Sequence, residues 1–378
     1  LKLTILRLTY LLICLLKKCF ETYDICSITS KSFKKVYFCT NLNNYMNKFY
    51  PLKIEEIRQL TSDSVEIKFQ ITSDISEKFQ FKAGQYITIK NEIDGDEIRR
   101  AYSLCSDQNS SEIAVGVKMV ENGRMSTFLT KNVKEGDVLE VMPPSGNFVL
   151  EGENVVGICA GSGITPILSM LKSGKADFKL VYGNKTESST MFYEEIKEQN
   201  SDNYFVFSRE EVEGSLKGRI NSETLDKIDG ILSADAYYIC GPGEMIEEVS
   251  EYLLKNHIEK SKIHFEKFSS SKKKKDSEES EIVDVLSDIT VIMDDEEFEY
   301  KLSSKGESIL DSAMQAGADV PFSCKGGVCC TCKAKVMEGK AVMSENYALS
   351  EEEVRDGYIL TCKAHPVSEK IIVDFDEM

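Results

Sequence analysis

The segment Cys324-Lys-Gly-Gly-Val-Cys-Cys-Thr-Cys332 has a C-x4-C-x2-C spacing, and Cys362 follows after 29 intervening residues. Four thiolates suit zinc or an iron–sulfur cluster. Structural zinc sites favour two C-x2-C pairs, and only one pair here has that spacing. The full arrangement is the plant-type 2Fe-2S spacing. We therefore predict a cluster bound by Cys324, Cys329, Cys332 and Cys362, with free or zinc-bound cysteines as the alternative and with Cys330 off the pattern.

The composition indicates several domains and argues against nucleic acid as a partner. The chain has 378 residues, with 63 acidic and 46 basic side chains, and a formal net charge of −17. Phosphate backbones need Lys and Arg counterparts, which an acidic protein lacks. The charge is concentrated near the cysteine cluster, because residues 281–378 carry 21 acidic and nine basic side chains. We expect this region to dock on a redox partner.

The first 45 residues differ from the rest of the chain. The apolar run at residues 1–16 contains Lys2 and Arg7 and is shorter than the roughly 20 residues that span a bilayer. No small-residue cleavage site follows it, and the first Met is Met46. We expect residues 1–45 to be an upstream extension that is not part of the native protein, with a membrane anchor as the alternative. No stable membrane association and a cytoplasmic location are expected.

Between Met46 and Glu281 the hydrophobic pattern changes twice. Residues 46–150 contain alternating apolar and polar positions and Gly/Asp/Asn turns, which predict an antiparallel β-barrel. Residues 151–268 contain continuous apolar runs separated by helical segments, which predict a parallel α/β sheet with five strands. Residues 269–281 have no apolar side chain, so we assign 269–286 to a charged flexible linker. Residues 287–378 form a third domain.

Three strand ends in residues 151–268 carry candidate nucleotide-binding residues. Gly161-Ser-Gly-Ile-Thr-Pro166 follows a buried strand and opens a helix, where glycines let a phosphate approach backbone N–H groups. Cys240-Gly-Pro242 ends a later strand. Ser208 and Arg209 end another, and a hydroxyl with a guanidinium could bind a 2′-phosphate. Each motif alone could be a tight turn or a surface arginine.

The predicted barrel carries two more motifs. Arg100-Ala-Tyr-Ser103 lies at a strand end, and Gly123-Arg-Met-Ser-Thr127 follows a strand. An arginine and loop amides can neutralise a pyrophosphate, a tyrosine ring can stack on a flat heterocycle, and a serine hydroxyl can bond its nitrogen. Either motif could instead be a buried tyrosine with a paired arginine.

In their order along the chain, these motifs resemble the ferredoxin–NADP⁺ reductase superfamily over residues 51–268, and residues 287–378 resemble a plant-type ferredoxin with a β-grasp fold. The resemblance implies FAD, NADP(H) and 2Fe-2S as cofactors, although FMN and NADH stay open. It implies catalytic roles for Ser103 and Cys240. The implied cofactor-binding residues are Arg100, Ala101, Tyr102, Ser103, Val117, Lys118, Gly123, Met125, Ser126, Thr127, Gly161, Ser162, Gly163, Thr165, Pro166, Ser208, Arg209, Cys240, Gly241 and Pro242.

The order flavin, nicotinamide and iron–sulfur resembles the reductase components of bacterial oxygenases, above all those serving phenylacetyl-CoA epoxidase. The resemblance implies an NAD(P)H-dependent oxidoreductase of phenylacetate catabolism that passes electrons to an oxygenase. Two alternatives stay open. One is a reductase for an aromatic-ring or steroid hydroxylase, and the other is a redox-sensing iron–sulfur protein without turnover.

Overall fold

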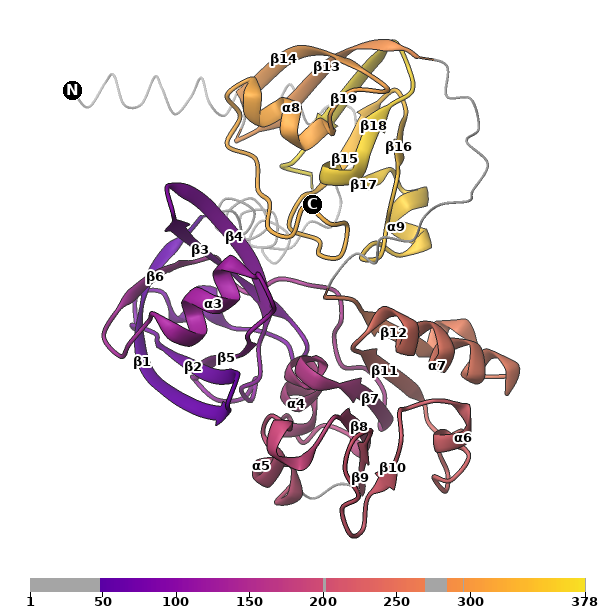
Figure 1. Cartoon of the computed structure of the whole chain (residues 1–378). Coiled ribbons are helices and arrows are strands. Elements are labelled where there is room, and N and C mark those ends of the chain that lie inside the picture. Colours follow the sequence, from indigo (N-terminus) through magenta and orange to yellow (C-terminus); the bar gives the residue numbers. More distant parts are fainter. Residues whose placement is uncertain (1–47, 200–201, 269–283, 295, 378) are drawn as a thin grey trace, which may run out of the picture. The chain divides into compact units, whose positions relative to one another are not determined.

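The computed structural model describes residues 48–199, 202–268, 284–294 and 296–377. The chain divides into residues Leu1–Asn44 and a compact unit, Tyr45–Met378, and every contact below lies within that unit. The predicted extension 1–45, and the predicted linker up to residue 283, lie outside the described residues. The unit contains three main β-sheets (Figure 1).

The first sheet is antiparallel and closes on itself. Its strand order is β4-β3-β6-β1-β2-β5, and a bridge between Leu104 and Val115 joins its two ends. Val65, Ile67 and Phe69 alternate along one strand and are almost fully buried, which is the expected pattern for a strand with one face in a core. The elements are β1 (Tyr50–Thr61), β2 (Ser64–Gln70), η1 (Ser76–Phe79), β3 (Tyr86–Ile93), β4 (Asp96–Ser103), β5 (Ile113–Lys118), α3 (Arg124–Lys131) and β6 (Val138–Val141).

The second sheet is entirely parallel, with the order β10-β9-β8-β7-β11-β12. The chain starts in the middle at β7, runs outward to β10, and then returns to the other side of β7. Ligands of such sheets bind beyond the carboxyl ends of the strands, at the point where the order reverses. The strands are β7 (Asn154–Ala160), β8 (Asp177–Asn184), β9 (Asp202–Phe207), β10 (Leu216–Lys217), β11 (Ala236–Cys240) and β12 (Ile263–Glu266).

This sheet has one strand more than the five predicted. The additional strand, β10, has only two residues, so it leaves no run of apolar residues in the sequence. The connecting helices are η2 (Gly161–Gly163), α4 (Ile164–Lys172), η3 (Glu187–Ser189), α5 (Tyr193–Lys197), α6 (Ser222–Leu225), α7 (Gly243–Lys255) and η4 (Lys260–Lys262).

The third sheet is mixed, and helix α8 packs with it (Figure 1). Its order is β14-β13-β19-β15-β17, with β13 and β19 parallel and the other pairs antiparallel. The elements are β13 (Leu286–Met293), β14 (Glu296–Ser303), α8 (Ile309–Gln315), β15 (Lys333–Glu338), β16 (Ala341–Met343), α9 (Glu351–Arg355), β17 (Tyr358–Leu360), η5 (Thr361–Lys363), β18 (Ala364–Pro366) and β19 (Lys370–Asp374). The predicted fold class of barrel, parallel α/β sheet and α+β domain is confirmed.

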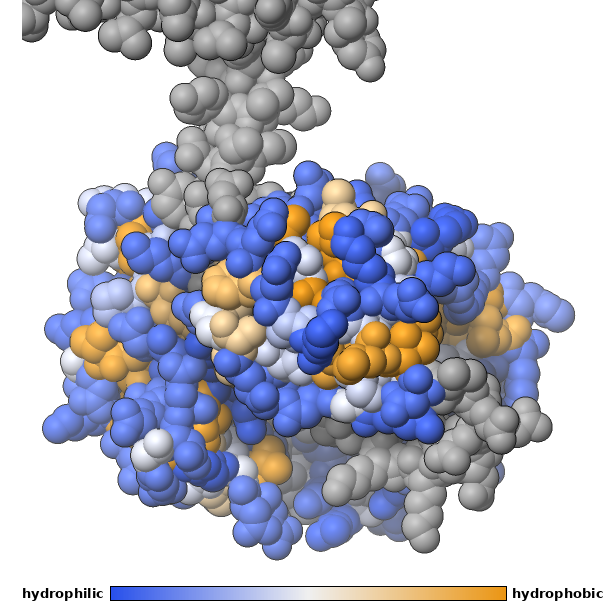
Figure 2. Space-filling model, turned by 90° about the horizontal axis from the view of Figure 1, so that it is seen from above, coloured by the Kyte–Doolittle hydropathy of each residue, from blue (hydrophilic) through white to orange (hydrophobic). Residues whose placement is uncertain are grey.

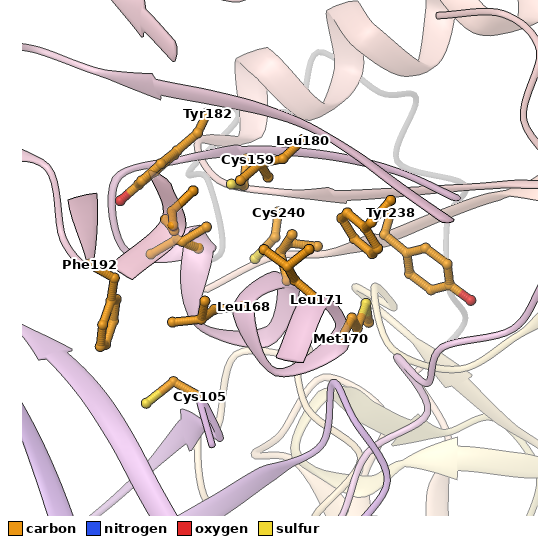
Figure 3. Packing of buried hydrophobic residues seen from close by; sticks show 14 of the residues in the cluster. Cys105, Cys159, Leu168, Met170, Leu171, Leu180, Tyr182, Phe192, Tyr238 and Cys240 are labelled. Atoms are coloured by element: carbon orange, nitrogen blue, oxygen red, sulfur yellow. The ribbon is translucent and has the colours of Figure 1, made fainter. Parts of the chain in front are cut away.

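The barrel and the parallel sheet share one hydrophobic core. Cys105, Ala114 and Phe148 from the barrel segment pack in the same cluster as Leu168 and Tyr238 of the parallel-sheet region. Figure 3 shows Cys105 near the residues of α4, with Cys159 and Cys240 among the neighbouring strands. This shared core explains how residues from the two regions reach one site.

The surface in Figure 2 is mostly hydrophilic, with hydrophobic side chains in separate patches. In the third domain the exposed large apolar residues are Leu286, Met314, Met337, Val342 and Val354. Among the described residues, no helix has both the length and the apolar character that a membrane span requires.

Candidate functional site

The glycine-rich turn after β7 packs closely against the end of β11. Gly161 has a positive φ of 56°, which favours glycine. A Cβ on Gly163 would lie 2.1 Å from the carbonyl oxygen of Cys240, and a Cβ on Gly241 would lie 3.2 Å from the amide nitrogen of Ala160. The structure therefore brings the two predicted motifs together, and both need glycine for that approach.

The turn leads directly into helix α4, which begins at Ile164. The Tyr182 hydroxyl donates to the carbonyl of Gly161 at 2.9 Å, and the Thr165 hydroxyl donates to the carbonyl of Ser162 at 3.1 Å. Thr165 and Pro166 are buried in the first turn of the helix. Gly161 and Ser162 are less buried, so they are the residues of this turn best placed to meet a ligand.

Ser208 and Arg209 lie at the same edge of the sheet, beyond β9. Their backbone N–H groups donate to the carbonyls of Asn184 and Lys185, at 3.0 and 2.9 Å. Lys185, Arg209 and Arg219 follow the carboxyl ends of three adjacent strands, and all three are exposed. None of them forms an ion pair with a described residue, whereas the neighbouring Lys217 pairs with Glu211. The edge therefore offers cations for an anionic ligand.

Cys240 and Glu266 end the neighbouring strands β11 and β12 and are register partners. Cys240 is fully buried, and desolvation, together with the nearby Glu266, raises the pKa of its thiol. Desolvation also raises the pKa of Glu266 to about 8. At neutral pH both groups are therefore mainly protonated.

Glu266 connects the parallel sheet to the barrel. The Ser103 hydroxyl donates to its carboxylate at 3.1 Å, so Ser103, Glu266 and Cys240 form one cluster. We did not predict Glu266 from the sequence. Its only signal is its position at the end of a short strand, and a single glutamate in His-Phe-Glu-Lys-Phe does not show burial.

The barrel motif residues lie on β4 and differ in exposure. Arg100 is exposed, and its guanidinium donates to the carbonyl of Arg99 at 2.7 Å; it has no ion pair among the described residues. Ala101 and Tyr102 are half-buried, and burial raises the pKa of the Tyr102 hydroxyl. Ser103 is buried. The strand thus presents a free cation and an aromatic ring beside the Ser103–Glu266 contact.

The second barrel motif starts helix α3, which packs on β3, β4 and β5. Gly123 is the N-cap residue. The Ser126 hydroxyl accepts from the N–H of Val120 at 3.1 Å and donates to the carbonyl of Gly123 at 3.2 Å. Thr127 is exposed. The two barrel motifs therefore lie on adjacent elements.

Three predicted cofactor residues of the barrel are placed differently. The side chains of Val117 and Met125 belong to the barrel core and are almost fully buried, so their backbone is what a cofactor could contact. Lys118 forms an ion pair with Asp63, with 3.3 Å between Nζ and Oδ1. Alternation along β5 explains the burial of Val117, which the position of the motif alone did not indicate.

The four cysteines of the predicted cluster form two pairs. The Sγ atoms of Cys324 and Cys329 are 3.1 Å apart, and the Cys332 and Cys362 thiols interact with each other. The Thr361 hydroxyl donates to the carbonyl of Cys332 at 2.9 Å, which holds the segment containing Cys362 against the loop. Among the described residues no group of three or more His, Cys, Asp or Glu could hold a single metal ion. Two thiolate pairs instead fit a cluster of two irons.

The loop backbone also suits an iron–sulfur cluster. Lys325 and Gly327 have positive φ angles of 48° and 71°, which curve the chain around the sulfurs. The N–H of Gly326 points to Sγ of Cys324 at 3.3 Å. The Cys329 thiol, followed by backbone N–H groups, lowers the pKa of Cys324 despite burial. Such N–H donors stabilise negative charge on cluster sulfurs.

Cys330 lies within this loop but is not part of either pair. Its Sγ lies 3.5 Å from the carbonyl oxygen of Ala348, and its N–H donates to the hydroxyl of Tyr86 on the barrel at 3.1 Å. The side chain therefore faces away from the four paired thiols.

Comparison with protein families gives three matches along the chain. Residues 51–150 match the oxidoreductase FAD-binding domain, residues 158–251 the oxidoreductase NAD-binding domain, and residues 291–367 the 2Fe-2S iron-sulfur cluster binding domain.

Characterised relatives cover nearly the whole described region. The chain is 36% identical to a subunit of the 1,2-phenylacetyl-CoA epoxidase of Escherichia coli over 355 residues, which are 88% of this chain and 99% of the relative. It is 30% identical to the ferredoxin reductase component of 3-ketosteroid-9-alpha-monooxygenase of Rhodococcus rhodochrous, over 86% of this chain and 96% of the relative.

A solved structure has the same domain content. Phthalate dioxygenase reductase, described as a modular structure for electron transfer from pyridine nucleotides to 2Fe-2S, superposes with a TM-score of 0.55 at 25% identity. The match covers 86% of this chain and 98% of that one. The chain therefore belongs to the family of NAD(P)H-dependent oxidoreductases with FAD-binding, NAD-binding and 2Fe-2S domains that act as reductase components of multicomponent oxygenases.

Proposed function

We propose that this reductase oxidises NADPH and delivers the electrons to phenylacetyl-CoA epoxidase in the cytoplasm. The observation that carries the proposal is the row of groups along one sheet edge. Arg219, Ser208–Arg209, Gly161, Cys240 and Glu266 follow the ends of adjacent strands. The specific acceptor is inferred from the 36% identity to the Escherichia coli epoxidase protein. A steroid hydroxylase is the second candidate, favoured by the relative at 30% identity.

The row assigns roles across the nicotinamide cofactor. The cations Arg209, Lys185 and Arg219 bind the 2′-phosphate, and the turn at Gly161 and Ser162 binds the pyrophosphate through backbone N–H groups. The nicotinamide lies at Cys240. The neutral thiol of Cys240 fills space beside the ring without introducing a charge that would oppose hydride transfer.

The barrel residues hold the FAD. Arg100 and the N–H groups at the start of α3 neutralise the pyrophosphate, Tyr102 packs on the flavin ring, and Ser103 lies next to its reactive nitrogen. Glu266 keeps a proton at the Ser103 hydroxyl and so maintains a neutral, hydrogen-bonded site. When bound, the cofactors supply the redox chemistry: a hydride from NADPH reduces the flavin, and single electrons pass to the 2Fe-2S cluster.

The proposed function is tested by anaerobic spectroscopy and an acceptor assay. Flavin and 2Fe-2S bands should both bleach with NADPH, and more slowly with NADH. Purified phenylacetyl-CoA epoxidase should then consume NADPH in a reductase-dependent reaction, faster than a 3-ketosteroid hydroxylase does. Turnover with the steroid enzyme alone would contradict the acceptor assignment, and a protein that NADPH does not bleach would contradict the whole proposal.

Replacing Cys362 should remove the cluster. Cys362→Ser breaks one thiolate pair, so we expect bound iron to fall to near zero and the 2Fe-2S absorption to be lost while the flavin bands remain. Cys330→Ser is the matched control, because Cys330 lies in the loop but outside both pairs, and it should retain its iron. Iron analysis with visible spectroscopy measures both, and equal retention in the two variants would refute the ligand assignment.

Replacing Arg209 should reduce the preference for NADPH. Removing a charged hydrogen bond to phosphate costs about 1.5–3 kcal/mol, so Arg209→Gln should lower kcat/KM for NADPH by about ten- to a hundredfold and leave that for NADH nearly unchanged. Lys217→Gln is the control, because Lys217 is an exposed cation of the same edge that already pairs with Glu211. An equal loss for both nucleotides would show that Arg209 does not contact the 2′-phosphate.

Replacing Glu266 should change how stability depends on pH. The folded-state pKa of about 8 lies above the unfolded value of about 4.5. Below pH 4.5 both states are protonated; as the pH rises towards 8, only the unfolded state gains stability by ionising. Wild-type protein should therefore lose unfolding temperature between pH 5 and pH 8 relative to Glu266→Gln. Glu248→Gln, at an exposed position on α7, should follow the wild type, and a parallel pH profile for Glu266→Gln would contradict the raised pKa.

A further inference from the structure

Tyr86 is held rigidly beside the proposed flavin site. It is the first residue of β3 and the register partner of Ser103 on β4. Its N–H and carbonyl exchange two hydrogen bonds with Ser145, both of 2.9 Å. Gly146 has a φ of 120°, and a Cβ there would lie 3.0 Å from the Tyr86 ring, so the glycine leaves room for the ring. The side chain is almost fully buried and has one well-defined direction.

The Tyr86 hydroxyl ends at the cysteine loop. It accepts from the N–H of Cys330 at 3.1 Å and lies 3.0 Å from Oγ1 of Thr331. Both partners stand between Cys329 and Cys332, which belong to different thiolate pairs. Burial raises the pKa of the Tyr86 hydroxyl well above its usual value, so it stays neutral and keeps both bonds.

The contact lies in a wider junction between the barrel and the third domain. A cavity of about 240 Å³ at this place is lined by Tyr86, Glu266, Cys329 and Cys330, among others. Asn147 Nδ2 donates to Oε1 of Glu353 at 3.1 Å on its rim. Glu266 is the residue that contacts Ser103, so the same cavity borders the proposed flavin site and the cysteine loop.

We propose that Tyr86 is a positioning residue for internal electron transfer, whose hydroxyl fixes the cluster-binding loop against the barrel at the flavin side. This rests on the proposed electron path from FAD to the cluster. One electron passes from the reduced flavin to one ferric ion of the cluster, which becomes ferrous. Tyr86 is neither oxidised nor deprotonated. Its ring and the Cys330 backbone provide the route with the fewest gaps between the strand of Ser103 and Cys329.

The test is Tyr86→Phe, with Tyr300→Phe as the matched control. The Phe variant keeps the ring and removes the hydroxyl, so the Cys330 N–H loses its acceptor. The Tyr300 hydroxyl donates to the carbonyl of Ile309 within the third domain and has no part in the junction. Bound iron and flavin are measured first for both variants, which compares proteins with equal cofactor content.

Two measurements then separate positioning from a structural role. In stopped-flow mixing with NADPH, Tyr86→Phe should reduce its flavin at the wild-type rate, while the bleaching of the cluster slows about fivefold, the effect of one lost hydrogen bond. In the oxidised protein without NADPH, hydrogen exchange in residues 326–333 should become about fivefold faster. Tyr300→Phe should match the wild type in both.

Other outcomes overturn the proposal. Wild-type exchange and wild-type cluster bleaching in Tyr86→Phe would show that the hydroxyl does not position the loop. The exposed variant Asn147→Ala, which removes the neighbouring contact to Glu353, should shift both measurements in the same direction by a smaller factor; no shift in it, together with a Tyr86→Phe variant that loses its cofactors, would also refute the proposal. Failure of the proposed function is distinct, because the wild-type flavin would then not be reduced by NADPH.

Discussion

The close approach between the turn after β7 and the end of β11 is the constraint on which the site depends. Without side chains at Gly163 and Gly241, the carbonyl of Cys240 and the amide of Ala160 can come within the distance of a single Cβ. This contact fixes two strand ends at the reversal point of the sheet. It also places the buried Cys240 thiol next to Glu266, and through Glu266 next to Ser103 on the barrel. One tight backbone contact therefore aligns groups from two sheets.

Much of the fold and part of the site could be predicted because their signals are local. The cysteine spacing, the alternating strand at Val65–Phe69 and the Gly161 turn each state a structure within a few residues. Glu266 could not be found in this way, since its burial arises from strands more than a hundred residues apart in the chain. The burial of Val117 and Met125 likewise depends on which face of the barrel each residue occupies, and β10 is too short to leave a pattern.

The electrostatics of the molecule separate the two ends of the proposed electron path. The nucleotide edge presents Lys185, Arg209 and Arg219 without acidic partners among the described residues. The region of residues 281–378 is strongly acidic. Phosphates of a nucleotide are drawn to the first, and a partner with a basic surface is drawn to the second. A chain with an overall charge of −17 can therefore bind an anion at one place and still favour cationic partners elsewhere.

The burial of the thiols outside the cluster pairs also affects the chemical durability of the protein. Cys105, Cys159 and Cys240 are inaccessible to solvent, and desolvation raises the pKa of each. Peroxide attacks thiolates rather than thiols, and it needs access to the sulfur. Reduced flavins and oxygen generate peroxide wherever they meet, so a sulfur next to the hydride path would be a vulnerable target if it were ionised. Its packing keeps Cys240 available as an uncharged neighbour of the nicotinamide and spares it from oxidation during long service.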